Sequence, residues 1–195
     1  MKYTRNILDL IELEIDYIGF IFYQKSKRYL LGKVPDLNLG KIEKVGVFVD
    51  ESFEKITNIA KTNGLDVLQL HGDESTEFCM SLKNAGYKIW KVFSVSTDFD
   101  FNICKRYINV VEAFLFDTKG TDPGGNGIRF DWDILQKYSL DIPFILSGGI
   151  GVEHIEDILN FNHDKCIGID INSGFEINAG NKDIDKIKSF IERIK

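Results

Sequence analysis

The sequence predicts an α/β fold, specifically a (β/α)8 TIM barrel of parallel strands that lacks its N-terminal strand, so that seven strands are visible. Three observations lead to this prediction. Seven short apolar runs recur along the 195 residues, amphipathic segments separate most of them, and the chain begins with a helical pattern instead of a strand. With 44% apolar residues and no Pro-rich linker, residues 1–195 are expected to form one domain.

The predicted strands are rich in Ile, Val, Phe and Tyr and show no alternation, which is typical of strands covered on both faces. They lie at residues 16–23, 43–49, 66–71, 88–94, 113–118, 142–147 and 166–170. Their roughly even spacing favours a barrel over two separate halves. An open doubly wound sheet is the alternative, but no G-x-G-x-x-G follows the first strand.

Apolar residues spaced three or four positions apart predict the helices. These lie at residues 52–62, 76–84 and 153–160. Before the first strand, Thr4 or Asn6 can cap a helix whose apolar face includes Ile7 and Leu10. The connection 32–41 contains proline and glycine, which predicts a loop or a single helical turn there.

A closed barrel of this type has eight strands and typically needs roughly 200 residues or more. Because the chain opens on a helix, we expect the N-terminal strand to be absent. The hydrogen-bonding edges of the strands at 16–23 and 166–170 would then be unpaired. We therefore expect a gapped barrel, and a chain that is fragile or self-associates through these edges.

Charge and composition exclude several classes of function. The net charge is −6, and no cluster of basic residues is larger than the short group Lys25, Lys27 and Arg28, so a nucleic-acid-binding surface is not expected. The longest apolar runs are too short to span a bilayer, and no leader sequence is visible. Cys79, Cys104 and Cys166 are scattered without the spacing of a disulfide framework or zinc site. A cytoplasmic protein without a bound metal is expected.

Polar residues follow the predicted strands, where barrel enzymes carry their catalytic groups. Asp117 ends an apolar run, so burial should raise its pKa and favour a proton-donor role over that of a turn-forming carboxylate. Gln69 and His71 alternate toward one face and are expected to line the cleft. Arg28 offers a planar fork for a carboxylate, although a solvated basic loop is an equal alternative. Asp170 ends the last strand.

Two glycine-containing turns follow the last two strands. They consist of Ser147, Gly148, Gly149 and of Asn172, Ser173, Gly174. Each alone is weak evidence, but together they predict a phosphate site, because loops after the last two strands hold phosphate in many barrels. The segment 121–127 is rich in Gly but lacks the Gly-Lys-Ser/Thr ending of a P-loop, which favours a mobile lid.

Several motifs together resemble the phosphoribosylanthranilate isomerase family of tryptophan biosynthesis. They are GFIFYQKSKRY (19–29), VGVFV (45–49), LQLHG (68–72), FDTK (116–119), GGNG (124–127) with FDW (130–132), LSGG (146–149) and DINSGFE (170–176). They follow the family order over nearly the whole chain, and their combination is far more specific than any one of them.

The resemblance implies an Amadori rearrangement of a small phosphosugar, N-(5-phosphoribosyl)anthranilate, with no metal or organic cofactor. Asp117 would be the general acid, and Arg28 would face the anthranilate carboxylate. The turns at Ser147 and Ser173 would hold the phosphate, and Asp170 would lie near sugar hydroxyls.

One departure from the family pattern concerns the general base. In the family this base is the cysteine of a Cys-Gly pair that ends the first strand, and no such position exists in this sequence. Either upstream residues supply the strand and its cysteine, which the intact remaining site favours, or the chain is a degenerate homologue. The rival functions are a noncatalytic phosphosugar-binding homologue and another phosphosugar isomerase, whose expected two related halves are not seen.

Overall fold

One parallel sheet of seven strands organises the protein in the computed structural model, which describes residues 1–118 and 131–195. The strands are β1 (Tyr17–Ile21), β2 (Glu43–Phe48), β3 (Val67–Leu70), β4 (Lys88–Val95), β5 (Ala113–Thr118), β6 (Phe144–Leu146) and β7 (Cys166–Ile169). Strands that neighbour one another in the sheet are consecutive in the chain. All seven predicted strands are confirmed, and each end lies within two residues of the prediction.

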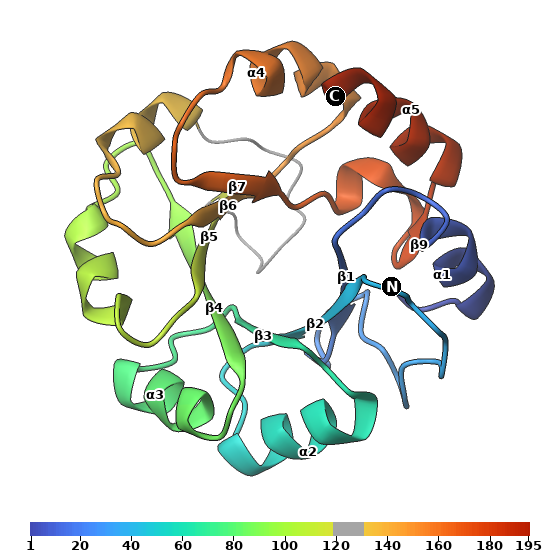
Figure 1. Cartoon of the computed structure of the whole chain (residues 1–195), viewed down its shortest axis with the longest axis horizontal. Coiled ribbons are helices and arrows are strands. Elements are labelled where there is room, and N and C mark those ends of the chain that lie inside the picture. Colours follow the sequence, from blue (N-terminus) through green and yellow to red (C-terminus); the bar gives the residue numbers. More distant parts are fainter. Residues whose placement is uncertain (119–130) are drawn as a thin grey trace.

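The sheet curls, so that its end strands β1 and β7 face each other across an opening (Figure 1). Every pairing between the strands is parallel. The carboxyl ends of the strands therefore meet at one edge of the curled sheet, and the residues that follow them are brought together there.

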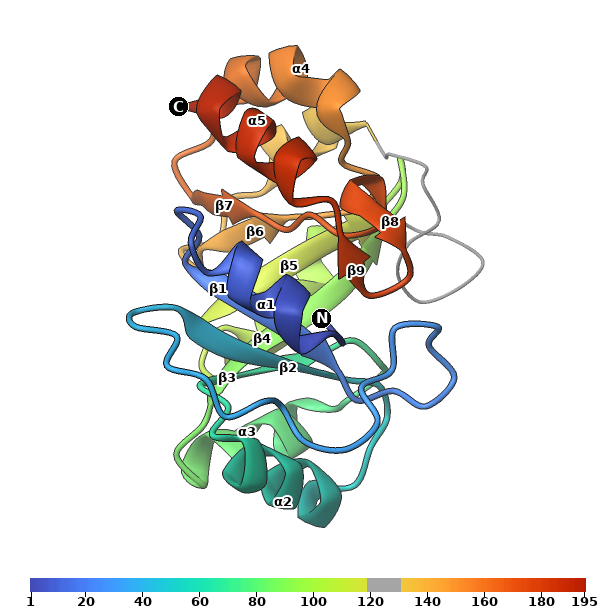
Figure 2. The same cartoon turned by 90° about the vertical axis from the view of Figure 1, so that its right-hand side faces the viewer.

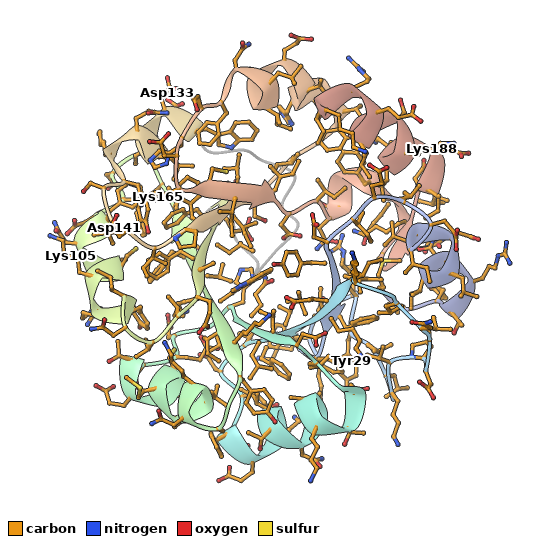
Figure 3. The ribbon with its side chains drawn as sticks, viewed as in Figure 1. Tyr29, Lys105, Asp133, Asp141, Lys165 and Lys188 are labelled. Atoms are coloured by element: carbon orange, nitrogen blue, oxygen red, sulfur yellow. The ribbon has the colours of Figure 1, made fainter. Side chains whose placement is uncertain are left out.

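Helices surround the sheet (Figure 2). They are α1 (Thr4–Leu10), α2 (Phe53–Asn63), α3 (Thr76–Asn84), α4 (Ile155–Asn160) and α5 (Ile184–Ile194). After β4 and β5 the chain forms the 3₁₀ helices η1 (Phe101–Tyr107) and η2 (Trp132–Lys137). The 3₁₀ helices η3 (Val152–His154) and η4 (Ser173–Phe175) and a hairpin of β8 (Glu176–Asn178) and β9 (Asn181–Lys182) complete the structure. Charged side chains such as Lys105 and Lys188 project outward from this layer (Figure 3).

The N-terminal helix forms as predicted, but its start was predicted wrongly. Tyr3 occupies the N-cap position without a side-chain capping bond. Asn6 is buried instead, where its amide donates to the carbonyl oxygen of Lys182 at 2.8 Å and accepts from the Lys182 backbone nitrogen at 2.7 Å. Tertiary contact with β9 therefore determines the place of Asn6, which its position in the sequence cannot reveal.

Two apolar layers hold the sheet in place. The larger lies between the strands and the helices, and includes an aromatic group in which Phe114, Phe116, Tyr138 and Phe144 pack mainly edge to face. The smaller layer lies inside the curl. It consists of Val45, Val67, Trp90, Val92, Ala113, Leu115 and Ile145. Strands covered on both faces account for the unbroken apolar runs in the sequence.

The inward-facing positions of the two end strands differ from this buried layer. Tyr17 of β1 is 43% exposed and Ile167 of β7 is 57% exposed, and both line a cavity of about 480 Å³. The cavity continues between α1 and α5, where it is lined by Leu10 and Ile194 among others. Among the described residues, no helix combines the length and apolar character needed to cross a bilayer.

Candidate active site

The cavity between the end strands also reaches the carboxyl edge of the sheet. There it is lined by the polar side chains of Gln69, His71, Asp117, Ser147 and Asp170, which come from four different strand ends. Parallel pairing brings these residues together although they span about half of the chain. The structure thus gathers into one cavity the groups that the sequence singled out at separate positions.

Asp117 is the most buried carboxylate facing this cavity. It ends β5, whose six residues are all buried, and it is itself 7% exposed. Its Oδ1 accepts a hydrogen bond from the Thr118 backbone nitrogen at 2.8 Å. Burial, and next the nearby charge of Asp170, raise the pKa of Asp117 to about 6. The side chain can therefore carry a transferable proton much nearer to neutral pH than an ordinary aspartic acid.

His71 is the closest ring partner of Asp117, with 3.4 Å between its Nε2 and Asp117 Oδ2. Burial, and next the positive charge of Lys91, lower the pKa of His71 to about 4. The imidazole is therefore neutral at physiological pH, and the contact is a hydrogen-bonding arrangement instead of an ion pair. A neutral ring leaves the raised pKa of Asp117 in place.

The raised pKa of Asp117 has a consequence for stability. Between about pH 4 and pH 6 the folded protein keeps a proton that the unfolded chain has lost, so stability falls as pH rises through this window. At pH 8, Asp117→Asn is expected to raise the free energy of unfolding by up to about 3 kcal/mol, and this gain should disappear below about pH 4. Urea unfolding at both pH values measures it.

The matched control for this substitution is Asp141→Asn, because the Asp141 carboxylate is 97% exposed and pairs with Lys165 at the surface. It should show no comparable gain at pH 8. An equal gain for Asp117→Asn at pH 4 and pH 8 would contradict the raised pKa, since a change in packing alone does not depend on pH.

Asp170 lies next to this pair at the end of β7. Its Oδ2 accepts a hydrogen bond from the Ser147 hydroxyl at 3.0 Å. Withdrawal from water raises the pKa of Asp170, against the opposing effects of the Lys182 charge and the Ser147 hydroxyl. Ser147 is thus held by a carboxylate, and the charge of that carboxylate makes it harder for Asp117 to ionise.

The two glycine-containing turns predicted to hold phosphate lie against each other. Gly148 and Gly149 have φ values of 90° and 68°, which L side chains rarely adopt. A Cβ at Gly174 would collide with the carbonyl oxygen of Ile150, so the second turn packs directly on the end of the first. The cavity is lined by Ser147, Gly148, Gly149, Asn172 and Ser173. Gly174 is not part of the lining and packs against Ile150 instead.

Lys182 was not predicted from the sequence, although it lines the same cavity. Its ammonium group donates to the Asn172 carbonyl oxygen at 2.9 Å and side-chain oxygen at 2.8 Å, and lies 3.3 Å from Glu176 Oε1. Burial lowers the pKa of Lys182, against the opposing charges of Glu176 and Asp170. A lysine at the end of a polar stretch gives no signal of burial, so its place becomes visible only in the fold.

Arg28 is positioned differently from the other predicted residues. Its Nε lies 2.9 Å and its Nη2 2.7 Å from Glu176 Oε2, so one edge of the guanidinium is occupied by a carboxylate of the protein. Arg28 does not belong to the cavity lining. The other edge retains donors for a second carboxylate, and the role of Arg28 in binding a substrate carboxylate stays a prediction.

The three cysteines lie in three different elements of the fold. Cys79 is buried in α3 and Cys104 is buried in η1, and burial raises the pKa of their thiols to about 11 and about 12. Cys166 opens β7, at the end of the strand opposite to Asp170. None of them lines the cavity, so none of them is a candidate base there.

Two further predictions lie outside the described residues. They are the mobile lid at 121–127 and the parts of the sequence motifs that fall at Lys119, 124–127 and Phe130. Within residues 1–118 and 131–195, no three His, Cys, Asp or Glu side chains gather as the ligands of a metal ion would.

Comparisons with known proteins agree with this arrangement. A family described as N-(5'phosphoribosyl)anthranilate (PRA) isomerase matches residues 2–193. An N-(5'-phosphoribosyl)anthranilate isomerase of Parabacteroides distasonis is 46% identical, with alignment over 100% of this chain and 90% of the relative. The protein of the same name from Phocaeicola vulgatus is 40% identical over 100% of this chain and 95% of the relative.

Solved structures give the same result. The crystal structure of phosphoribosyl anthranilate isomerase from Thermotoga maritima matches with a TM-score of 0.82 and 32% identity, over 100% of this chain and 95% of the other. A second isomerase, solved in complex with reduced 1-(o-carboxyphenylamino)-1-deoxyribulose 5-phosphate, has a TM-score of 0.78 and 30% identity, covering 100% and 94%. This chain belongs to the N-(5'-phosphoribosyl)anthranilate isomerase family.

Proposed function

We propose that this protein catalyses the Amadori rearrangement of N-(5'-phosphoribosyl)anthranilate to 1-(2-carboxyphenylamino)-1-deoxyribulose 5-phosphate in tryptophan biosynthesis, in the cytoplasm. The observation that carries the proposal is Asp117, a buried carboxyl with its pKa raised to about 6, which faces a cavity beside two adjoining glycine turns. Family membership supports the choice of substrate.

In the proposed mechanism, Asp117 gives its proton to the furanose ring oxygen as the bond from this oxygen to C1′ breaks. The nitrogen lone pair of the anthranilate forms an iminium with C1′. A base then removes the proton from C2′, and its electron pair moves through C1′ to the nitrogen to form an enolamine. Tautomerisation of the enolamine gives the ketone product. No atom is gained or lost, and the role of the base falls to a group other than the three cysteines.

The remaining site residues have roles in binding. The turns at Ser147–Gly149 and Asn172–Gly174 would hold the phosphate through backbone N–H groups, close to the charge of Lys182. Gln69, His71 and Asp170 would contact the sugar, and the free edge of Arg28 would receive the anthranilate carboxylate. The reduced product analogue bound in the related crystal structure also carries a phosphate group and a carboxylate.

We further propose that an eighth strand fits between β1 and β7 and carries the base. Two observations support this. Within the described residues β1 pairs in the sheet with β2 and β7 with β6, so no strand lies on the other side of either. On that side of β1 the Met1 amino group donates to the Gly19 carbonyl oxygen at 2.7 Å, and the Leu30 backbone nitrogen donates to the Ile21 carbonyl oxygen at 2.8 Å. The inward positions Tyr17 and Ile167 are exposed toward the cavity, whereas equivalent positions of the central strands are buried. Without this strand, the chain would have little activity and would tend to self-associate through its edges.

The direct test measures both binding and turnover. The chain should bind the reduced product analogue, observed by calorimetry, and should convert N-(5'-phosphoribosyl)anthranilate slowly, observed by chromatography of the product. Binding that persists while even a form with the eighth strand fails to turn over would support the rival, a noncatalytic phosphosugar-binding homologue. Absence of both would count against the site itself.

Gly148→Ala tests the phosphate turn. A Cβ at this position would meet the Thr118 backbone nitrogen and Asp117 Oδ1, so the turn and the proposed acid must both move. We expect the affinity for the reduced product analogue to fall by about tenfold or more, since 1.4 kcal/mol of lost contact is a factor of ten. Calorimetric titration measures the change.

Gly86→Ala is the matched control for this substitution, because Gly86 has a φ of 93° but no atom lies within 4 Å of the position that a Cβ would take there. Both variants should lose about 1–2 kcal/mol of stability from the left-handed backbone. The affinity should change only in Gly148→Ala. Equal affinities of the two variants would show that the turn does not hold the ligand.

A further inference from the structure

Lys91 carries a buried positive charge that the proposed mechanism does not use. It lies in the middle of β4 between Trp90 and Val92, and only 3% of it is exposed. A lysine is rarely buried to this extent without partners, because removal of its charge from water is strongly unfavourable. The contacts of its ammonium group therefore indicate what Lys91 does.

Those contacts surround His71. The Lys91 Nζ donates to the carbonyl oxygens of Leu70 at 3.3 Å and Gly72 at 2.7 Å, the residues on either side of His71. It also donates to the Val92 carbonyl oxygen at 3.1 Å and lies 3.2 Å from Glu74 Oε2. One ammonium group thus fixes the backbone on both sides of the imidazole.

Glu74 completes the arrangement and is equally buried, with 3% of its side chain exposed. Its carboxylate accepts hydrogen bonds from the backbone nitrogens of Gly72, at 3.0 Å, and Asp50, at 3.1 Å. The hydroxyl of Tyr107 donates to its backbone oxygen at 2.9 Å. The pair formed by Lys91 and Glu74 is therefore satisfied in all directions and has little freedom to move.

We propose that Lys91 is a positioning residue for this reaction, which fixes His71 against Asp117 and keeps the imidazole neutral by placing a permanent positive charge next to it. The proposal rests on the proposed function. The charged groups near His71 are Asp117 from β5, 3.4 Å from its Nε2, and Lys91 from β4, whose ammonium group is paired with Glu74 from the loop after β3. The direction of the pKa of His71, which is lowered first by burial and then by Lys91, agrees with this role.

The charge of His71 is important because it affects the pKa of Asp117, and therefore whether this side chain carries a proton. An imidazolium 3.4 Å away would stabilise the carboxylate form and lower the pKa of Asp117, so a smaller fraction of the acid would hold its proton near neutral pH. A neutral imidazole instead accepts a hydrogen bond from the protonated carboxyl. Lys91 would thus act on the proton donor through His71, without contacting the substrate.

The experiment is an NMR titration of the imidazole protons, which needs no turnover. The chain contains three histidines, so His154 and His163 serve as internal controls. In Lys91→Met the pKa of His71 should rise by about one pH unit or more, because a positive neighbour is lost and Glu74 is left unpaired. In Lys91→Arg, which keeps the charge, His71 should titrate as in the unchanged protein.

Two outcomes would overturn the proposal. One is a folded Lys91→Met variant in which His71 titrates as before. The other is an equal rise of the His71 pKa in Lys91→Met and Lys91→Arg, which would show that Lys91 only stabilises the conformation of the loop. If Lys91→Met does not fold, the double variant with Glu74→Gln removes both charges together and should remain folded. The pKa of His71 should then be higher in the double variant than in Glu74→Gln alone, which keeps the Lys91 charge, and equal values in these two variants would also refute the proposal.

Failure of the proposed function is distinguishable from failure of this inference. If His71 responds as expected but the protein never converts N-(5'-phosphoribosyl)anthranilate, the electrostatic role of Lys91 stands and the assigned reaction does not. Lys83→Met provides a further control, because Lys83 lies on α3 and pairs with Glu112 at the surface. It should leave all three histidine titrations unchanged.

Discussion

Asp117→Asn is expected to lower turnover by about 100- to 10,000-fold, the usual contribution of a positioned general acid. The asparagine keeps the shape of the side chain and the acceptor for the Thr118 backbone nitrogen, but it has no proton to give to the ring oxygen. Affinity for the reduced product analogue should change little. Steady-state kinetics and calorimetric titration measure the two quantities separately.

Turnover should also depend on pH, because the acid must be protonated to act. The acid acts in its protonated form, and its pKa is about 6, so turnover should fall as pH rises above that value. Asp141→Asn, at an exposed carboxylate, should leave the profile unchanged. A variant Asp117→Asn that retains turnover within about tenfold of the original would remove Asp117 from the proposed mechanism.

Addition of an N-terminal strand that ends in a cysteine should raise turnover by about 100- to 10,000-fold, because it would supply the base for the C2′ proton. It would also lie between β1 and β7, in place of the Met1 amino group that bonds to the Gly19 carbonyl oxygen of β1. Extension of the gene with its own upstream codons, or with the corresponding segment of a relative, makes the comparison. The measurements are turnover, and size-exclusion chromatography to detect self-association.

The same extension with alanine in place of the cysteine separates the two effects. It should restore stability and reduce self-association, since the backbone edges are paired, yet leave turnover low. Equal turnover of the short and extended chains would refute the account of the base. In the extended protein, Asp117→Asn should likewise lower turnover by about 100- to 10,000-fold.

The sequence predicts the sheet well because a strand that is buried on both faces appears in the sequence as an unbroken apolar run. A run such as Ala113–Thr118 is apolar at successive positions since both its faces are covered, and the residue that ends it must then lie at the carboxyl edge. Asp117, His71 and Asp170 were found in this way. Their contacts with one another follow from parallel pairing, which the alternation of strands and helices already implies.

Contacts between side chains that are far apart in the sequence produce no local sequence pattern. Arg28 and Glu176 are 148 positions apart, and neither has neighbours that would suggest an ion pair. Lys91 stands out in the sequence as a charge within an apolar strand. The carbonyl groups that accept its hydrogen bonds, however, can be identified only when β3 and β4 lie side by side. The helix α5 was also missed, although Asp183 caps it and its apolar residues are periodic.

The hydrogen bonds between Asn6 and Lys182 join residues 176 positions apart. During translation, α1 leaves the ribosome early, while its partner β9 is among the last elements to be made. The Asn6 amide and the apolar face of α1 must therefore wait for most of the synthesis before the elements that cover them, β9 and α5, are made. Contacts of such high sequence separation also form slowly after release. We therefore expect the yield of folded protein in a cell to depend on chaperones more strongly than its final stability does.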